Sequence, residues 1–256
     1  EVDAYFFCRE AYEWYNALAG AGGRAGWDNG QYPDPPVPHQ PVRALAHVWD
    51  DYPVTGTPTS RSNNAFMDEA IAGGKWYAFL AYFDGDPTAT CSTPNDRASD
   101  YVAGSKAVVG HEYQHAITDF SFIDSGNNPG LTYFGWLAAV HEGLSDVFGC
   151  LFAENWFPGQ DTSSAGLANR NLAFPRDPNT WCNLPYTANT PCGLSNHNKD
   201  HFADRNADGG FRYDRGTILA HCAYLMGQGG VHQRASRTPA LIPVYSIGRE
   251  IFTGKD

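Results

Sequence analysis

Apolar residues recur at helical spacing in two stretches of the 256-residue chain, residues 3–20 and 135–156, and each stretch therefore predicts a helix. Residues 108–120 lie between them and are predicted to form a third helix. Residues 42–50 alternate between apolar and polar side chains as a half-buried strand does, and a second strand is predicted around residues 78–83. The chain thus mixes helices with strands, and at this length it can form one large domain or two lobes.

The helix predicted at residues 108–120 carries His111, Glu112 and His115 in the pattern H-E-x-x-H. Residues four apart lie on one face of a helix, about one turn apart, so both imidazoles can point at one metal ion. Glu112 is then placed to reach a metal-bound water, as in zinc hydrolases where this carboxylate serves as the general base. An ordinary amphipathic helix that happens to carry two histidines is the alternative.

A catalytic zinc ion needs a third protein ligand and an open fourth position. In the helix predicted at residues 135–156, Glu142 and Asp146 are four residues apart on one face. Glu142 is the natural third ligand, and Asp146 could accept the free ring N–H of a zinc-bound histidine and so fix its tautomer. The alternative is two solvated surface charges, but they would sit among Leu, Val and Phe, where unpaired carboxylates are costly.

The segments HEYQHAITDF and LTYFGWLAAVHEGLSDVFG resemble the thermolysin-like neutral zinc metalloproteases, whose third ligand is a glutamate in an N-E-x-x-S-D-like helix. Here that helix reads HEGLSD, with His141 where the family usually has asparagine. The resemblance implies an α+β fold of two lobes with the zinc helix between them. We expect a mixed α/β N-terminal lobe at residues 1–125, including the zinc helix, and a mainly α-helical C-terminal lobe at residues 126–256.

The resemblance also implies residues that contact the substrate. Residues 62–68, SNNAFMD, are similar to an N-N-A-F-W segment whose edge backbone pairs with the substrate peptide, which makes Asn64 and Ala65 substrate-binding positions. Taken alone, the segment predicts a loop or an edge strand. Tyr133 lies nine residues before Glu142, as the family's transition-state tyrosine does. Its phenol would donate to the oxyanion, although without the resemblance a core aromatic residue is the favoured interpretation.

The region from residue 200 to residue 230 departs from the family pattern, in which a histidine after Gly-Gly donates to the tetrahedral intermediate. Counted from the Gly-Gly pair, Arg212 occupies the position of the histidine, and Ala207 occupies the position of the acid that orients it. Counted back from the Ala-Tyr-Leu triplet, the two become Tyr213 and Asp208. We take Arg212 as a candidate catalytic residue, because an arginine can donate with permanent charge. Losing one such donor commonly lowers the rate about 10²–10³-fold.

The stretch NRNLAFPRDPNTW resembles the family segment that supplies an arginine to the substrate carbonyl. Arg170 is the substrate-binding candidate and Arg176 its competitor. A surface arginine is an equally good interpretation of either.

Zinc is the expected cofactor, and the family's double calcium site is expected to be absent. That site needs an acid four residues before the first zinc histidine, where this chain has Ala107. It also needs a glutamate where this chain has Ala153. The sequence leaves open whether a calcium ion binds at another position.

The charge balance narrows the range of partners. Lys and Arg number 17 and Asp and Glu 28, which gives a net charge of −11. Without a run of Lys or Arg, this argues against nucleic acid and anionic membranes. No apolar run approaches the ~18 residues that span a bilayer. The first residues do not resemble a signal peptide, and we expect a mature or trimmed product that is shorter than the family at both ends.

Six cysteines without a C-x-x-C pair argue against a cysteine zinc site and, being even in number, suggest disulfides in an extracellular protein. Cys182 and Cys192 flank a Pro/Asn/Thr loop and form the predicted local pair. Six buried free thiols are the alternative.

Together these observations predict a secreted, monomeric zinc metalloendopeptidase that acts on peptide or protein substrates. His111, His115 and Glu142 bind zinc, and Glu112 takes a proton from the zinc-bound water and passes it to the leaving amine. The resemblance implies a preference for a bulky apolar residue just after the scissile bond. Two alternatives remain: a catalytically weakened or inactive zinc-binding scaffold for peptides or partners, and a zinc hydrolase that acts on a non-peptide bond.

Overall fold

The fold is described from a computed structural model of the chain. The residues that the structure describes are 2–18, 42–48, 65–72, 75–83, 102–122, 135–162, 170–177, 198–200 and 212–229.

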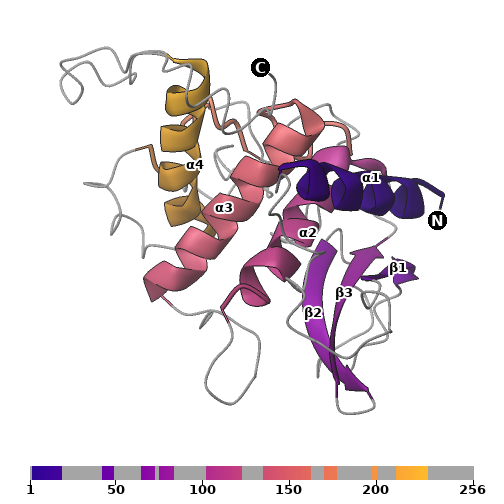
Figure 1. Ribbon diagram of the computed structural model, residues 1–256. Coiled ribbons are helices and arrows are strands. Elements are labelled where there is room, and N and C mark those ends of the chain that lie inside the picture. Colours follow the sequence, from indigo (N-terminus) through magenta and orange to yellow (C-terminus); the bar gives the residue numbers. More distant parts are fainter. Residues whose placement is uncertain are drawn as a thin grey trace, which may run out of the picture.

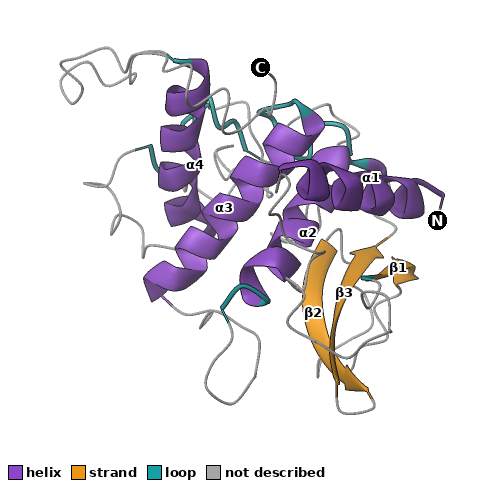
Figure 2. Cartoon of the chain, in the orientation of Figure 1, coloured by secondary structure: helices purple, strands orange, loops and turns teal. Residues whose placement is uncertain are grey.

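Within these segments, the structure has four α-helices, one 3-10 helix and three strands (Figures 1 and 2). The helices are α1 (Val2–Leu18), η2 (Val102–Gly104), α2 (Lys106–Asp119), α3 (Gly135–Ala153) and α4 (Arg212–Gln228), and the strands are β1 (Arg43–Val48), β2 (Ala65–Ala72) and β3 (Lys75–Phe83). The three helices and two strands predicted above are therefore confirmed, with boundaries that shift by a few residues. In the described part of the chain, none of the helices has the length and hydrophobicity needed to cross a membrane.

The strands form one sheet in the order β1-β3-β2. β1 runs parallel to β3, and β2 pairs antiparallel with β3 from Ala65 opposite Tyr82 to Ala72 opposite Lys75. β2 is therefore an edge strand among the described residues. The predicted strand at residues 78–83 is the second half of β3, which begins earlier, at Lys75.

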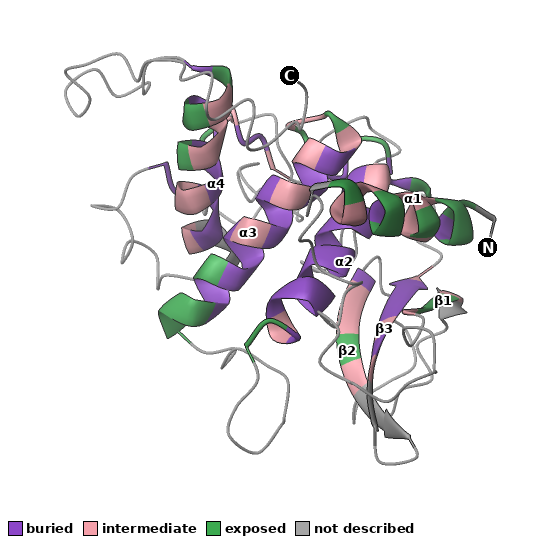
Figure 3. Ribbon diagram, viewed as in Figure 1, coloured by how far each residue is buried: buried purple, intermediate pink, exposed green. Residues whose placement is uncertain are grey.

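α2 lies in the middle of the molecule, between the sheet and α3 (Figure 1). Ser105 caps its first turn, because the Ser105 hydroxyl accepts a hydrogen bond from the Val108 N–H at 3.3 Å. Towards the sheet, α2 contributes Val109 and Tyr113 to a hydrophobic cluster that also contains Leu80 of β3. Residues 109–118 are all buried (Figure 3), so this part of α2 presents no solvent-exposed polar face.

Two glycines allow the helices around the site to pack closely. A Cβ on Gly149 of α3 would lie 2.5 Å from the carbonyl oxygen of Ala107 and 2.9 Å from the backbone nitrogen of His111, both on α2. A Cβ on Gly143 would lie 2.6 Å from the carbonyl oxygen of Gly216 on α4. Only a residue without a side chain fits at these contacts, so the backbones of α2, α3 and α4 are held close together.

Candidate metal centre

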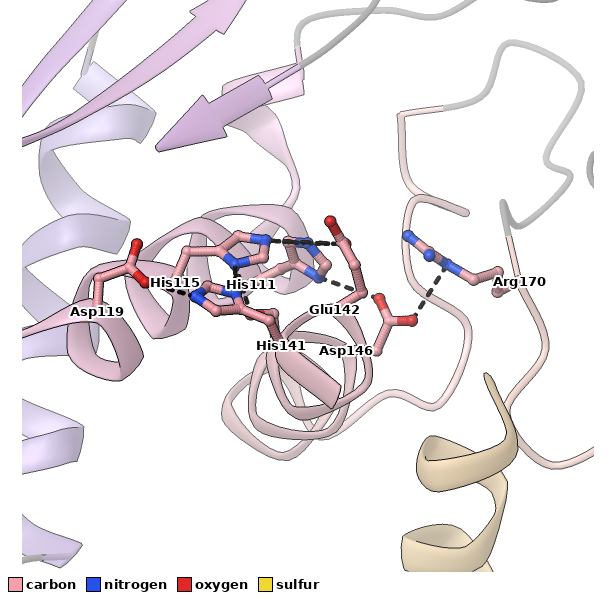
Figure 4. A network of polar contacts seen from close by, with 8 residues as sticks. His111, His115, Asp119, His141, Glu142, Asp146 and Arg170 are labelled. Atoms are coloured by element: carbon pink, nitrogen blue, oxygen red, sulfur yellow. Dashed lines mark hydrogen bonds and ion pairs between the residues drawn. The ribbon is translucent and has the colours of Figure 1, made fainter. Parts of the chain in front are cut away.

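Three side chains from α2 and α3 converge on one point (Figure 4). The Nε2 atoms of His111 and His115 are 3.0 Å apart, and Glu142 Oε2 lies 3.5 Å from the first and 3.8 Å from the second. Tetrahedral zinc with bonds of 2.0–2.1 Å places its ligand atoms about 3.3 Å apart. The three predicted ligands are thus buried together at separations that suit one zinc ion.

The two helices position these ligands by simple geometry. His111 and His115 are four residues apart, so their rings leave the same face of α2. Glu142 leaves the face of α3 that packs against α2, and the close approach at Gly149 brings its carboxylate within reach of both rings. The ligand set therefore depends on the α2–α3 crossing as much as on the motif.

The far nitrogen of the His111 ring meets a buried carboxylate. Asp146 Oδ1 lies 3.0 Å from His111 Nδ1, and Asp146 Oδ2 lies 3.2 Å from Nε of Arg170. Asp146 thus stands between the ring and the guanidinium (Figure 4), with its own side chain fully buried. A carboxylate at this position fixes the ring's tautomer and orientation and makes the nitrogen that faces the metal more basic.

The far nitrogen of the His115 ring meets other groups. Its Nδ1 contacts Nδ1 of His141 and lies 3.1 Å from the hydroxyl oxygen of Ser145. His141 Nε2 in turn lies 2.8 Å from Asp119 Oδ1. Sequence reasoning noted His141 only as a departure from the family and missed Asp119. A signal was present, because Asp119 follows His115 by four residues on the same helix.

Glu112 is buried, with only 6% of its surface exposed. Burial raises the pKa of its carboxyl group to about 7, and the nearby Glu142 also raises it, whereas His111, a hydrogen bond from the Met67 backbone and Arg170 lower it. A carboxylate with a pKa near neutrality suits a general base, because it can both take up and release a proton at that pH. The contact with Met67 also places Glu112 beside the edge strand β2.

The residues present fit a divalent cation. Burial lowers the pKa of the His111 ring, but Asp146, Glu142 and Glu112 outweigh it and raise the pKa to about 10, so the site attracts positive charge. No hydrogen bond from any described residue reaches the buried Glu142 Oε2. A buried carboxylate oxygen without a donor is costly unless a cation neutralises it. Glu112, Glu142 and Asp146 place three carboxyl groups here beside the one guanidinium of Arg170, so the site favours a cation.

Known proteins resemble this chain along most of its length. It is 27% identical to a thermolysin of Alicyclobacillus acidocaldarius subsp. acidocaldarius over 243 residues, which cover 93% of this chain and 34% of that protein. It is 29% identical to neutral protease B of Bacillus subtilis (strain 168) over 226 residues, 83% of this chain and 36% of that protein. No model of a protein family matches the chain.

A solved structure, the precursor of protealysin, a metalloproteinase from Serratia proteamaculans, has a similar fold. The TM-score is 0.56 with 20% sequence identity, and the match covers 88% of this chain and 58% of that one. The fold is thermolysin-like. The resemblance stated from the sequence and the α+β fold class are both confirmed. The chain spans about a third of the length of the curated relatives that it matches.

The other residues predicted for a thermolysin-like site are only partly described. Ala65 is buried at the start of β2, and Arg170 contacts Asp146 beside the ligands, whereas its competitor Arg176 pairs with Asp200 at 3.1 Å. Asn64 and Tyr133 lie outside the described residues. Arg212 is the first residue of α4, and its side chain is also outside the description.

Three of the six cysteines belong to the described residues, and all three, Cys8, Cys150 and Cys222, are free thiols. Pairing of all six cysteines, which the even count suggested, is therefore wrong for this structure. Cys150 is fully buried beside Val147 of the same helix, where a small apolar side chain packs well without a partner sulfur. The predicted Cys182–Cys192 pair lies outside the described residues.

Proposed function

We propose that this chain is the catalytic part of a secreted zinc metalloendopeptidase that hydrolyses peptide bonds in peptides or proteins. The observation that carries the proposal is the arrangement of His111, His115 and Glu142 at zinc-ligand separations, with the buried Glu112 on the same helix. The similarity to proteins named thermolysin, bacillolysin and neutral protease supports it. We also propose that lobes at residues 1–125 and 126–256 flank this site.

His111, His115 and Glu142 would hold the zinc ion. When bound, zinc polarises the substrate carbonyl and makes water a stronger acid, which are the two kinds of chemistry that a Lewis acid offers here. Asp146 holds the His111 ring in the tautomer that keeps Nε2 free for the metal. The protein therefore supplies a rigid set of three donors with a free position for water or substrate.

Glu112 would act as the general base and then as the general acid. Its carboxylate takes a proton from the attacking water and passes it to the nitrogen of the leaving amine, so the same residue serves both halves of the reaction. The burial of Glu112 and its pKa of about 7 suit this shuttle. Tyr133 and Arg212 are proposed to donate hydrogen bonds to the oxyanion that forms on the substrate carbonyl.

Substrate binding is proposed at the edge of the sheet. β2 pairs with β3 on one side, and an extended peptide could pair with its other side beside Glu112, which the Met67 backbone contacts. Asn64 and Ala65, at the start of this edge, and Arg170 would grip the substrate. By resemblance, we propose a preference for a bulky apolar residue just after the scissile bond.

Hydrolysis of casein or a furylacryloyl dipeptide tests this function. We expect zinc-loaded wild type to cleave, a chelator to abolish turnover, and Glu112→Gln to reduce kcat by at least about 10²–10⁴-fold while zinc stays bound. Turnover that survives Glu112→Gln would refute the mechanism. No turnover in zinc-loaded wild type would favour the binding scaffold.

A further inference from the structure

His141 is a buried histidine that the proposed reaction does not use. Its exposed fraction is 1%, and its ring stacks on that of His115 with centroids 4.5 Å apart and planes 21° apart. It is not one of the three residues whose donor atoms cluster as metal ligands. His141 instead contacts the far side of the His115 ring, away from the ligand atoms (Figure 4).

The contacts of these rings allow one arrangement of protons with both rings neutral. His115 directs Nε2 towards His111 and Glu142, so Nε2 must keep its lone pair for a metal and the proton must sit on Nδ1. Because that Nδ1–H faces Nδ1 of His141, the latter must accept. The proton of His141 is then on Nε2, where it can donate to Asp119 Oδ1 at 2.8 Å.

We propose that Asp119 acts through His141 to fix the orientation and tautomer of His115, so that Asp119 and His141 are positioning residues for the metal centre. Each zinc histidine is then supported by its own carboxylate, Asp146 directly for His111 and Asp119 through an imidazole for His115. This inference rests on the zinc site of the proposed function. It does not depend on which bond the protein cleaves.

A second acceptor beside the same ring could provide the support instead. Ser145 Oγ lies 3.1 Å from His115 Nδ1. If the serine were the support, Asp119 would have no influence on zinc binding, and Ser145→Ala would weaken zinc binding more than Asp119→Ala. The experiment therefore compares both routes.

The test measures the zinc affinity of the full chain by competition with a chromophoric chelator. Asp119→Ala, which removes the acceptor for the His141 Nε2–H, should weaken zinc binding about 10–100-fold, the usual effect of removing such a support. His141→Asn, the residue that the resembling family usually carries, should bind zinc nearly as wild type does, because an amide oxygen can accept the His115 N–H alone. In the His141→Asn background, Asp119→Ala should then have no further effect.

Glu10→Ala is the matched control. It removes an ion pair between α1 and α2, Lys106 Nζ to Glu10 Oε2 at 3.0 Å, at the opposite end of α2 from Asp119. It should leave the zinc affinity unchanged even if it lowers the melting temperature. Equal losses from Asp119→Ala in both backgrounds, or no loss in either, would overturn the proposal.

A second measurement needs no variant. Long-range ¹H–¹⁵N correlation spectra of the zinc-loaded protein report which ring nitrogen carries the proton. We expect the proton of His141 on Nε2 and that of His115 on Nδ1, and a proton on Nδ1 of His141 would overturn the proposal. A wild type that binds zinc and shows these tautomers but cleaves no peptide would refute the proposed function and leave this inference intact.

Discussion

His111 and His115 lie one turn apart on α2, yet their far ring nitrogens meet different supports. The His111 ring meets Asp146, a fully buried carboxylate on α3 that also pairs with Arg170 of a separate segment. The His115 ring meets His141 on α3, which pairs with Asp119 on α2 itself, and the Asp119 side chain keeps 15% of its surface exposed.

This difference shows that the two histidines of one H-E-x-x-H motif can be oriented by different kinds of contact. The support of His111 brings together three elements and a buried charge pair, so it is tied to the assembled core. The support of His115 consists of residues of α2 and α3 alone, and it ends at Asp119, whose side chain is partly exposed. Changes to the crossing should affect both histidines, and changes to one carboxylate should affect mainly its own ring.

The largest effect is expected from Gly149→Ala. The new Cβ would lie 2.5 Å from the Ala107 carbonyl oxygen and 2.9 Å from the His111 nitrogen, so α2 and α3 must separate. Such overpacking costs about 1–3 kcal/mol, which lowers the melting temperature by about 3–10 °C. Zinc affinity should fall with it, because the ligand separations widen.

The matched control for this change is Gly227→Ala on α4. A Cβ there meets nothing within 4 Å, and alanine is the better helix former, so the melting temperature should stay the same or rise. Thermal unfolding followed by circular dichroism gives both values. Equal effects at the two glycines would show that the close crossing does not control stability.

The next largest effect is expected from removing the charge of Asp146, in comparison with Asp119. Asp146→Asn should weaken zinc binding more than Asp119→Asn does, towards the upper end of the usual 10–100-fold range. The reason is that Asp146 contacts its ring without an intermediate and is fully buried, whereas Asp119 acts through His141. Chelator competition gives both affinities under the same conditions.

Asp146→Asn should also destabilise the fold, because it leaves the Arg170 guanidinium without this carboxylate. Adding Arg170→Gln should restore part of the stability but none of the zinc affinity. If the double variant recovered zinc binding, Asp146 would act by neutralising Arg170 and not by holding His111.

The clustering of the three candidate ligands was predictable because it depends on local geometry. His111 and His115 share a face of α2 by their spacing, and Glu142 and Asp146 share a face of α3. The expected contact between Asp146 and a histidine needed only that these faces meet. What the sequence could not show was which histidine Asp146 would contact, since that depends on the crossing at Gly149.

The remaining contacts depend on how distant segments pack. Arg170 was predicted to bind substrate, but its pairing with Asp146 could not be derived, because its segment has no regular pattern. The contact of Asp119 does not follow from the family pattern, because asparagine is usual at the position of His141, whereas an imidazole there can accept on one nitrogen and donate from the other. The sequence predicts the start of β3 at about residue 78, whereas β3 begins at Lys75, because its first residues pair with the end of β2.

The smallest effect concerns Glu69 on β2, which lies near the support of His115. Burial raises the pKa of Glu69 to about 7, and the charges of Asp119 and Asp68 raise it further. No described residue donates a hydrogen bond to its Oε1. Its carboxylate is therefore less favourable in the folded protein than in the unfolded chain.

The sign of the pH dependence follows from that difference. The unfolded carboxyl group has a pKa of 4.5, so between this pH and about 7 the folded state binds more protons, and stability falls as the pH rises through this window. Glu69→Gln removes this loss and should raise the melting temperature at pH 8 by about 1–2 °C, a small value because the side chain is partly exposed to solvent. At pH 4 the variant and the wild type should melt together.

Asp119→Asn sharpens this test, because of the two charges that raise the pKa of Glu69 it removes the one with the larger effect. In that background, the benefit of Glu69→Gln at pH 8 should shrink, whereas in Asp68→Asn it should change less. Thermal unfolding of the zinc-saturated proteins at pH 4 and pH 8 supplies the comparison. If Glu69→Gln raised the melting temperature at pH 8 as much in Asp119→Asn as in the wild type, the charge of Asp119 would not act on Glu69. The influence of Asp119 would then be confined to the histidines.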